Sequence, residues 1–302
     1  MKVGAIVGPT AVGKTDVALE VATRIGAEIV SVDSMQIYKG MNIGTATPPP
    51  EITDRVPHHL LDLFEPERVL SVQEFQTLAR AAVEDITSRG RVPLLVGGSG
   101  LYFRAVVDDL RFPPRSAEVR ARLEDEIESE GAPALHERLR KADPVAAERI
   151  EPQNARRIVR ALEVVELTGR PFSENDTWER YESIYALTVI GLTRARPDLF
   201  ARIEARVAAM LDEGLLEEVE SLKDAGMSAT ARQALGYKQV VEAPPGATPE
   251  QIGGEIVKAT KRFARRQESW FRADPRVVWF NAAEAGLGER LVAHFRASLE
   301  LP

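Results

Sequence analysis

One loop sequence, GPTAVGKT at residues 8–15, constrains the fold of this chain more than any other feature. It matches the pattern G-x-x-x-x-G-K-[ST] and lies between a short apolar run at 3–7 and a helical pattern at 16–24. In that setting backbone N–H groups and a lysine converge on a polyphosphate, and the final hydroxyl can bind Mg²⁺. The pattern specifies a diphosphate and leaves open what is attached to it. The predicted diphosphate-binding residues are Gly8, Pro9, Thr10, Ala11, Val12, Gly13, Lys14 and Thr15, with Thr15 also the predicted metal ligand.

The rest of the chain alternates short β-branched runs with longer helical patterns. The runs lie at residues 3–7, 28–32, 92–96, 184–190 and 276–280. Such alternation predicts a parallel α/β sheet. Between residues 114 and 182 the strand signal disappears and apolar residues recur at helical spacing. We therefore expect a P-loop NTPase-like α/β core made of 1–113 and 183–302, with C-terminal basic helices, and an inserted helical domain at 114–182.

Composition excludes several kinds of chemistry. The chain has no cysteine, which rules out disulfides, thiol nucleophiles and cysteine-based zinc sites. His58 and His59 are adjacent, so they cannot both face one side of a strand, and a packing role is favoured over a metal site. The N-terminal apolar run is too short for a signal or a membrane span. We expect a soluble, cytoplasmic protein that does not bind a membrane.

Polar residues follow the second and third predicted strands. Asp33 and Ser34 end the second run, and a Gly-Gly-Ser-Gly loop containing Ser99 ends the third. Ligands of open parallel sheets bind at that edge, so these loops should share one crevice with the phosphate loop. For Asp33, three roles stay open from position alone: general base, Mg²⁺ ligand or helix cap. The distance to the substrate decides between them.

Two helices concentrate positive charge in a chain whose net charge is −7. One has Lys258, Lys261, Arg262, Arg265 and Arg266 on one side, with aromatic residues interleaved. It is a candidate contact with a nucleic-acid backbone, although a solvated face over core aromatics remains an alternative. The other lies in the insertion, so two basic helices on separate domains suggest a cleft. The candidates in the insertion are Arg120, Gln153, Asn154, Ala155, Arg156 and Arg157. Arg122, Arg138, Arg140 and Arg160 could line the same cleft, although arginines among many glutamates are usually only surface charge.

Seven blocks in the chain resemble, in order, the tRNA dimethylallyltransferase family, also called isopentenyl-tRNA transferases. These blocks are GPTAVGKT at 8–15, VDSMQIYKGMNIGTATP at 32–48, HHLLD at 58–62, GGSGLYFRA at 97–105, PQNARRIVRALEV at 152–164, RQALGYK at 232–238 and TKRFARRQESWFR at 260–272. Together they cover most of the chain. The cysteine-based zinc finger of eukaryotic members is absent, so the resemblance is to the bacterial type.

The resemblance implies a reaction and its partners. Dimethylallyl diphosphate would bind the phosphate loop with Mg²⁺, and a tRNA anticodon stem-loop would present the acceptor. The acceptor is N6 of the adenosine 3′-adjacent to the anticodon, position 37, in tRNAs that read codons beginning with U. That adenine would be flipped into a channel, since a stacked base cannot reach an electrophile held in a crevice. The product is N6-dimethylallyladenosine, and we expect the enzyme to be a monomer.

The resemblance also implies residue roles. Asp33 would be the general base, and Ser99 and Arg196 would complete the catalytic set, with Arg196 on the diphosphate. Ser99 replaces the family's usual Thr, and Val12 replaces a frequent Ser. The implied tRNA-binding residues are Asp33, Ser34, Met35, Gln36, Ser99, Arg120, Gln153, Asn154, Ala155, Arg156, Arg157, Lys261, Arg265 and Arg266.

Two other functions fit parts of the pattern. A P-loop small-molecule kinase would use Asp33 on Mg²⁺, although it would not need the basic stripe at 258–272. A binding module without catalysis would not need Lys14, Thr15 and Asp33 together. The loop pattern alone would be called an ATP site; our hypothesis is that it binds the prenyl diphosphate, because prenyl transfer involves no phosphoryl transfer.

Overall fold

The computed structural model describes residues 1–175 and 180–301 of the chain. These residues form two compact units: a core of residues 1–108 and 181–302, and a helical unit of residues 109–180. None of the helices in the described part of the chain combines the length and apolar composition needed to cross a membrane.

The core is built on a six-stranded sheet in the order β3-β2-β4-β1-β5-β6, and every strand pair is parallel. The predicted parallel α/β fold is thus confirmed. The strands are β1 (Lys2–Val7), β2 (Ala27–Ser31), β3 (His58–His59), β4 (Val92–Gly97), β5 (Ala186–Thr193) and β6 (Val277–Asn281). The core helices are α1 (Lys14–Ile25), α2 (Pro50–Thr53), α3 (Val72–Ser88), α4 (Gly100–Val107), α9 (Arg196–Asp212), α10 (Leu215–Ala225), α11 (Tyr237–Val241), α12 (Pro249–Arg272) and α13 (Leu287–Leu299).

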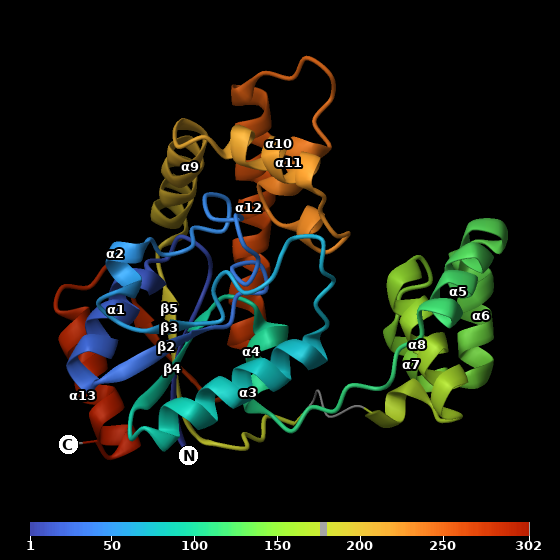
Figure 1. The fold of residues 1–302 in the computed structure, drawn as a ribbon. Coiled ribbons are helices and arrows are strands. Elements are labelled where there is room, and N and C mark those ends of the chain that lie inside the picture. The colour runs from blue at the N-terminus through green and yellow to red at the C-terminus, as the bar shows by residue number, and fades with distance from the viewer. Residues whose placement is uncertain (176–179, 302) are drawn as a thin grey trace. The chain divides into compact units, whose positions relative to one another are not determined.

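Helices cover both faces of the sheet, so its central strands are apolar on both sides. On β1, Val3, Ala5 and Val7 pack in the cluster that contains Phe75 of α3, and the intervening Ile6 packs with Phe295 of α13. Figure 1 shows α1 and α13 together, and α3 beside α4. This alternation of side chains is why a continuous apolar run, rather than a half-polar one, marks each central strand.

The pair His58 and His59 forms the short edge strand β3, next to β2. His59 Nε2 lies 2.8 Å from the Glu28 carboxylate, and His58 Nδ1 lies 2.7 Å from the Val56 carbonyl oxygen. Hydrogen bonds from Arg89 lower the pKa of Glu28 to about 2, against a desolvation penalty. The pair therefore anchors the sheet edge, and no group of three or more potential metal-binding side chains occurs in the described residues.

The helical unit consists of four α-helices around its own apolar cluster, which includes Leu123, Leu139 and Leu162. The fully buried Glu163 accepts hydrogen bonds from the Ser116 N–H, Arg120 and Arg160. These helices are α5 (Ala117–Glu130), α6 (Ala132–Ala142), α7 (Pro144–Arg149) and α8 (Ala155–Thr168).

Candidate active site

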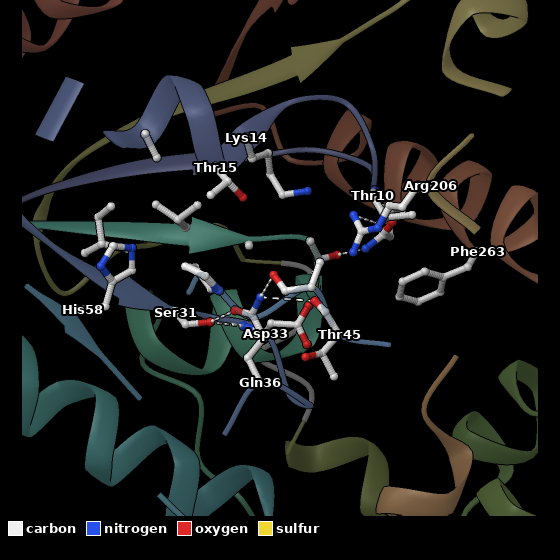
Figure 2. Close-up of a pocket in the computed structure, with 18 residues that line it drawn as sticks. Thr10, Lys14, Thr15, Ser31, Asp33, Gln36, Thr45, His58, Arg206 and Phe263 are labelled. Carbon is white, nitrogen blue, oxygen red and sulfur yellow. Dashed lines mark hydrogen bonds between the residues drawn. The ribbon is translucent and has the colours of Figure 1, made fainter. Parts of the chain in front are cut away.

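A cavity of about 110 Å³ lies at the carboxyl edge of the sheet. It is lined by residues of the β1–α1 loop, the segment after β2, the β4–α4 turn, and helices α9 and α12. Figure 2 shows Lys14 and Thr15 from the phosphate loop pointing into the same space as Asp33 and Arg206. A larger cavity of about 500 Å³ shares Thr10, Asp33 and Arg206 and extends to Arg262 and Arg266. The two cavities therefore meet at one set of polar side chains.

The phosphate loop has the backbone geometry that its glycines permit. Gly8 has φ +146°, and a Cβ there would lie 2.6 Å from the Leu192 carbonyl oxygen. The Lys14 ammonium donates to the carbonyl oxygens of Gly8 (3.0 Å) and Pro9 (2.8 Å). Burial and the nearby Arg206 lower the pKa of Lys14 to about 8, although Asp33 opposes the shift. Val12 is fully buried in the core, so its side chain does not face the cavity.

Asp33 lies directly after β2 and lines both cavities. Its Oδ1 accepts the Met35 N–H at 2.9 Å, which fixes a tight turn. No helix begins at this point, so the carboxylate caps a turn rather than a helix. Ser34 and Met35 line the larger cavity, so the turn points a carboxylate into the space where two ligands could meet.

Gln36 connects β2 to the loop at 45–46. Its Oε1 accepts from the Ser31 hydroxyl at 2.7 Å, and its Nε2 donates to the carbonyl oxygens of Thr45 and Ala46 at 3.3 Å each. Farther along, Glu218 of α10 accepts the N–H groups of Asn42 and Ile43 at 3.0 and 2.9 Å. These contacts fix the loop that carries Thr45 to the cavity wall.

Ser99 also reaches the larger cavity, at the first turn of α4. It is the residue before the helix, yet its hydroxyl makes no capping hydrogen bond to α4. The backbone of Gly97 and Gly98 lines the smaller cavity. The geometry therefore brings the Gly-Gly-Ser-Gly loop to the same edge as the phosphate loop and Asp33.

Arg206 of α9 is a cavity residue that the sequence reasoning missed. It lines both cavities, and its Nη1 donates to the Thr10 hydroxyl at 3.3 Å. Burial lowers its pKa, and Asp33 raises it by a smaller amount. Arg202, one turn earlier, donates from Nε to the Ala11 carbonyl oxygen at 2.9 Å. Their four-residue spacing on a helix was the available signal, but Arg196 was the only residue of this helix for which a role was predicted.

Arg196 does not line either of the two cavities described above. It is the first residue of α9 and is exposed, whereas Arg206 lies ten residues later on the same helix. Ten helical residues span about 15 Å, so the two backbone positions lie nearly three turns apart along α9. On the phosphate side, the structure places Arg206 and Arg202 of α9 against the loop, and the role of Arg196 on the diphosphate stays a prediction.

The predicted tRNA-binding residues lie in both units. In the core, Lys261 pairs with Glu204 at 2.5 Å, Arg266 lines the larger cavity, and Arg265 is exposed. In the helical unit, Asn154 Oδ1 caps α8 by accepting the Arg157 N–H, and Arg120 pairs with Glu163 at 3.1 Å. The remaining members of this set are the exposed Gln153, the half-buried Ala155 and the exposed Arg156 and Arg157.

Comparison with known proteins places this geometry in a family. The sequence pattern of the IPP transferase family matches residues 36–274. The chain belongs to the IPP transferase family. Its relatives include the tRNA dimethylallyltransferase of Streptomyces coelicolor, 51% identical over 94% of this chain and 91% of that protein. The enzyme of the same description from Acidothermus cellulolyticus is 52% identical over 95% and 91%.

Solved structures agree with this IPP transferase assignment. A tRNA isopentenylpyrophosphate transferase from Bacillus halodurans matches with a TM-score of 0.74 and 40% identity, covering 99% of this chain and 97% of that one. A eukaryotic dimethylallyltransferase, solved while acting on tRNA, has a TM-score of 0.85, and at 24% identity it supports the fold alone. The match covers 100% of this chain and 80% of the eukaryotic chain. None of these proteins is a kinase.

Proposed function

We propose that this protein transfers a dimethylallyl group from dimethylallyl diphosphate to N6 of the adenosine at tRNA position 37, releasing diphosphate. The observation that carries the proposal is Asp33, a carboxylate shared by a small cavity beside the phosphate loop and a larger cavity that extends to basic residues of α12. Transfer between two separately bound substrates requires such a meeting point. Family membership and the relatives' activity support the same reaction.

The donor diphosphate fits the small cavity. Lys14 and Arg206 supply positive charge there, and the loop backbone around Gly13 supplies N–H groups at the start of α1. Negative charge grows on the diphosphate as its bond to the prenyl carbon breaks. Preorganised cations and N–H groups in a confined site stabilise that developing charge. Lys14 and Arg206 therefore act on the leaving group.

The acceptor adenine fits the larger cavity. Asp33 would accept the proton from the N6 amine as nitrogen forms its bond to the prenyl carbon, and the carbon–oxygen bond to diphosphate breaks. The Ser99 hydroxyl would hydrogen-bond the diphosphate or the base, and Ser34, Met35 and Gln36 would lie beside the flipped adenine. A flipped base is the natural acceptor, because its exocyclic amine becomes accessible only outside the stack.

A divalent cation, Mg²⁺, fits the donor side. The Thr15 hydroxyl lines the small cavity, and magnesium sites commonly combine one or two protein oxygens with substrate phosphate oxygens and water. No metal-binding cluster of His, Cys, Asp and Glu occurs in the described residues, which agrees with a metal held jointly with the substrate. When bound, the ion would add positive charge next to the leaving diphosphate.

The tRNA would contact basic residues on both units. Lys261, Arg265 and Arg266 of α12 would bind the backbone near the larger cavity, and Arg120 with residues 153–157 would bind another part of the anticodon stem-loop. We propose that the enzyme acts as a monomer in the cytoplasm.

The direct test is to incubate the purified protein with Mg²⁺, radiolabelled dimethylallyl diphosphate and unmodified tRNA, and to analyse the nucleosides. We expect label in N6-dimethylallyladenosine without added ATP. A tRNA carrying guanosine at position 37 is the matched control and should take up no label. An absolute need for ATP, or ATP consumption on a small acceptor with no labelled tRNA, would reject the proposal in favour of a kinase.

A further inference from the structure

Gln267 of α12 joins two loops of the candidate active site. Its side chain is only 6% exposed and lines the small cavity. Nε2 donates to the Gly98 carbonyl oxygen at 3.0 Å, and Oε1 accepts the Thr10 N–H at 2.8 Å. One amide therefore links the loop after β4 to the loop after β1. None of the roles proposed above uses this residue.

Helix α12 approaches the Gly-Gly-Ser-Gly loop so closely that a Cβ on either of two glycines would force a side chain of α12 to move. A Cβ on Gly98 would lie 2.2 Å from Gln267 Nε2, and a Cβ on Gly100 would lie 2.0 Å from Trp270 Cδ1. Gln267 and Trp270 are three residues apart, so they lie on one face of the helix. Ser99 is the residue between the two glycines. Helix α12 thus packs on the backbone at both sides of Ser99.

The chemistry of the link favours an amide. The Gly98 carbonyl needs a donor and the Thr10 N–H needs an acceptor, and the neutral amide of Gln267 offers both from two separate atoms. A glutamate at 267 could accept from Thr10 but would repel the Gly98 carbonyl oxygen. It would also put a negative charge beside the space proposed for the diphosphate. The neutral amide satisfies both loops without opposing an anion.

We propose that Gln267 is a positioning residue for the transfer reaction: it sets the Ser99 loop at a fixed place relative to the phosphate loop. Its effect on the rate is exerted through the Ser99 hydroxyl. Trp270 supports the same loop from the Gly100 side. The inference rests on the proposed function, because Ser99 is given a role only in that reaction.

A double-mutant cycle between position 267 and position 99 tests this link. Gln267→Met keeps the length of the side chain and removes both hydrogen bonds, and we expect the single-turnover rate to fall about 10–100-fold. The dissociation constants for donor and tRNA should stay within about threefold. Gln267→Glu should also have a rate below that of the wild-type enzyme. Gln73→Met, on the exposed side of α3, is the matched control and should retain the wild-type rate.

The decisive comparison uses the Ser99→Ala variant as the starting enzyme. Adding Gln267→Met to it should lower the single-turnover rate by less than about threefold further. If the two costs multiply instead, or if Ser99→Ala alone leaves the rate unchanged, Gln267 does not act through Ser99 and the inference is wrong. Should Gln267→Met unfold, Trp270→Leu replaces it in the same cycle, because Trp270 is 43% exposed. A wild-type enzyme that transfers no label contradicts the proposed function instead.

Discussion

Arg206 in the core and Arg160 in the helical unit are both partly buried arginines on helices, but their surroundings differ. Arg160 donates to Glu163 at 2.7 Å and to the carbonyl oxygens of Pro113 and Pro114. Arg206 donates to the Thr10 hydroxyl and has no carboxylate within ion-pair distance in residues 1–175 and 180–301. A buried charge is costly unless a partner compensates it. The comparison suggests that Glu163 compensates the charge of Arg160 within the helical unit, whereas an anionic ligand would compensate the charge of Arg206.

The same contrast holds for the exposed arginines. Arg122 and Arg138 of the helical unit both pair with Glu126 and Glu166. On α12, Arg265 and Arg266 have no ion pair within the described part of the chain, and Arg266 lies over the Phe263 ring. The number of basic residues in a segment therefore says little about nucleic-acid binding until their carboxylate partners are known.

The largest effect expected in the core cavity is that of Asp33→Asn. The amide keeps the size of the side chain but cannot take the N6 proton, so the single-turnover rate should fall about 10²–10⁴-fold. The tRNA dissociation constant, measured by filter binding, should change by no more than a few-fold. Equal losses of rate and tRNA binding would make Asp33 structural, like the buried carboxylate of the helical unit.

Arg206→Met should weaken donor binding about 10–100-fold, because charge-assisted hydrogen bonds to the diphosphate are lost. Titration calorimetry with dimethylallyl diphosphate and Mg²⁺ measures this constant. Arg196→Met, at the exposed start of the same helix, tests the competing assignment, and we expect a smaller loss of donor binding than for Arg206→Met. If Arg206→Met lowers thermal stability but leaves donor affinity unchanged, Arg206 has a structural role like that of Arg160, and the comparison is wrong.

Glu163→Gln should lower the free energy of unfolding by about 1–3 kcal/mol, since Arg120 and Arg160 lose a buried charged acceptor. Burial opposes ionisation of Glu163, but hydrogen bonds from Arg160, the Ser116 N–H and Arg120 lower its pKa overall. Its stabilising contribution is therefore present above the unfolded pKa of about 4.3 and is lost as pH falls through the folded value. Chemical denaturation at neutral and acidic pH checks both points, and donor affinity at neutral pH should match wild type.

Raising the pH should weaken donor binding by up to about tenfold per unit once the pH exceeds the Lys14 pKa of about 8. Affinity falls with rising pH because the Lys14 ammonium, which would bind the diphosphate, loses its proton above its lowered pKa. This happens at a lower pH than for an ordinary lysine. Donor titrations between pH 7.5 and 9.5 measure the slope. Lys14→Arg keeps its charge across this range and should show a flat profile.

The smallest effects should come from the exposed arginines proposed to bind tRNA. Arg156→Ala with Arg157→Ala, and separately Arg265→Ala with Arg266→Ala, should each weaken tRNA binding several-fold and flatten its salt dependence by about 1–2 in the logarithmic slope. Arg122→Ala with Arg138→Ala is the matched control, because both side chains are engaged by glutamates. A slope change in the control as large as in the other pairs would contradict the comparison.

The parallel sheet and the phosphate loop could be predicted because their signals are local. Each central strand is a short apolar run, and residues 8–15 form a contiguous pattern with a known backbone geometry. Predicted and observed strand limits differ by a few residues, as for β5, predicted at 184–190 and found at Ala186–Thr193. The edge strand His58–His59 was missed as a strand because two residues carry no periodicity.

The remaining cavity residues could not be predicted in the same way. Arg206 and Gln267 reach the cavity only because α9 and α12 dock against loops that lie about 200 residues or more earlier in the chain. Helical periodicity assigns Ile203 and Val207 to a core face, but it does not say what the neighbouring Arg206 will meet. The family resemblance pointed to Arg196, which lies ten residues before Arg206 on the same helix, and its role stays a prediction.

The position of β1 in the sheet has a consequence for synthesis on the ribosome. One edge of β1 pairs with β4, but the other pairs with β5, beginning at Lys2 opposite Ala186. At about 5–20 residues per second, the second partner emerges roughly 10–40 s after the first strand is made. During that interval the helical unit is synthesised in full, while the backbone N–H and C=O groups along one edge of β1 remain unpaired. Helices α9 and α12 follow later still, so the candidate active-site cavity cannot be completed until most of the chain has been made.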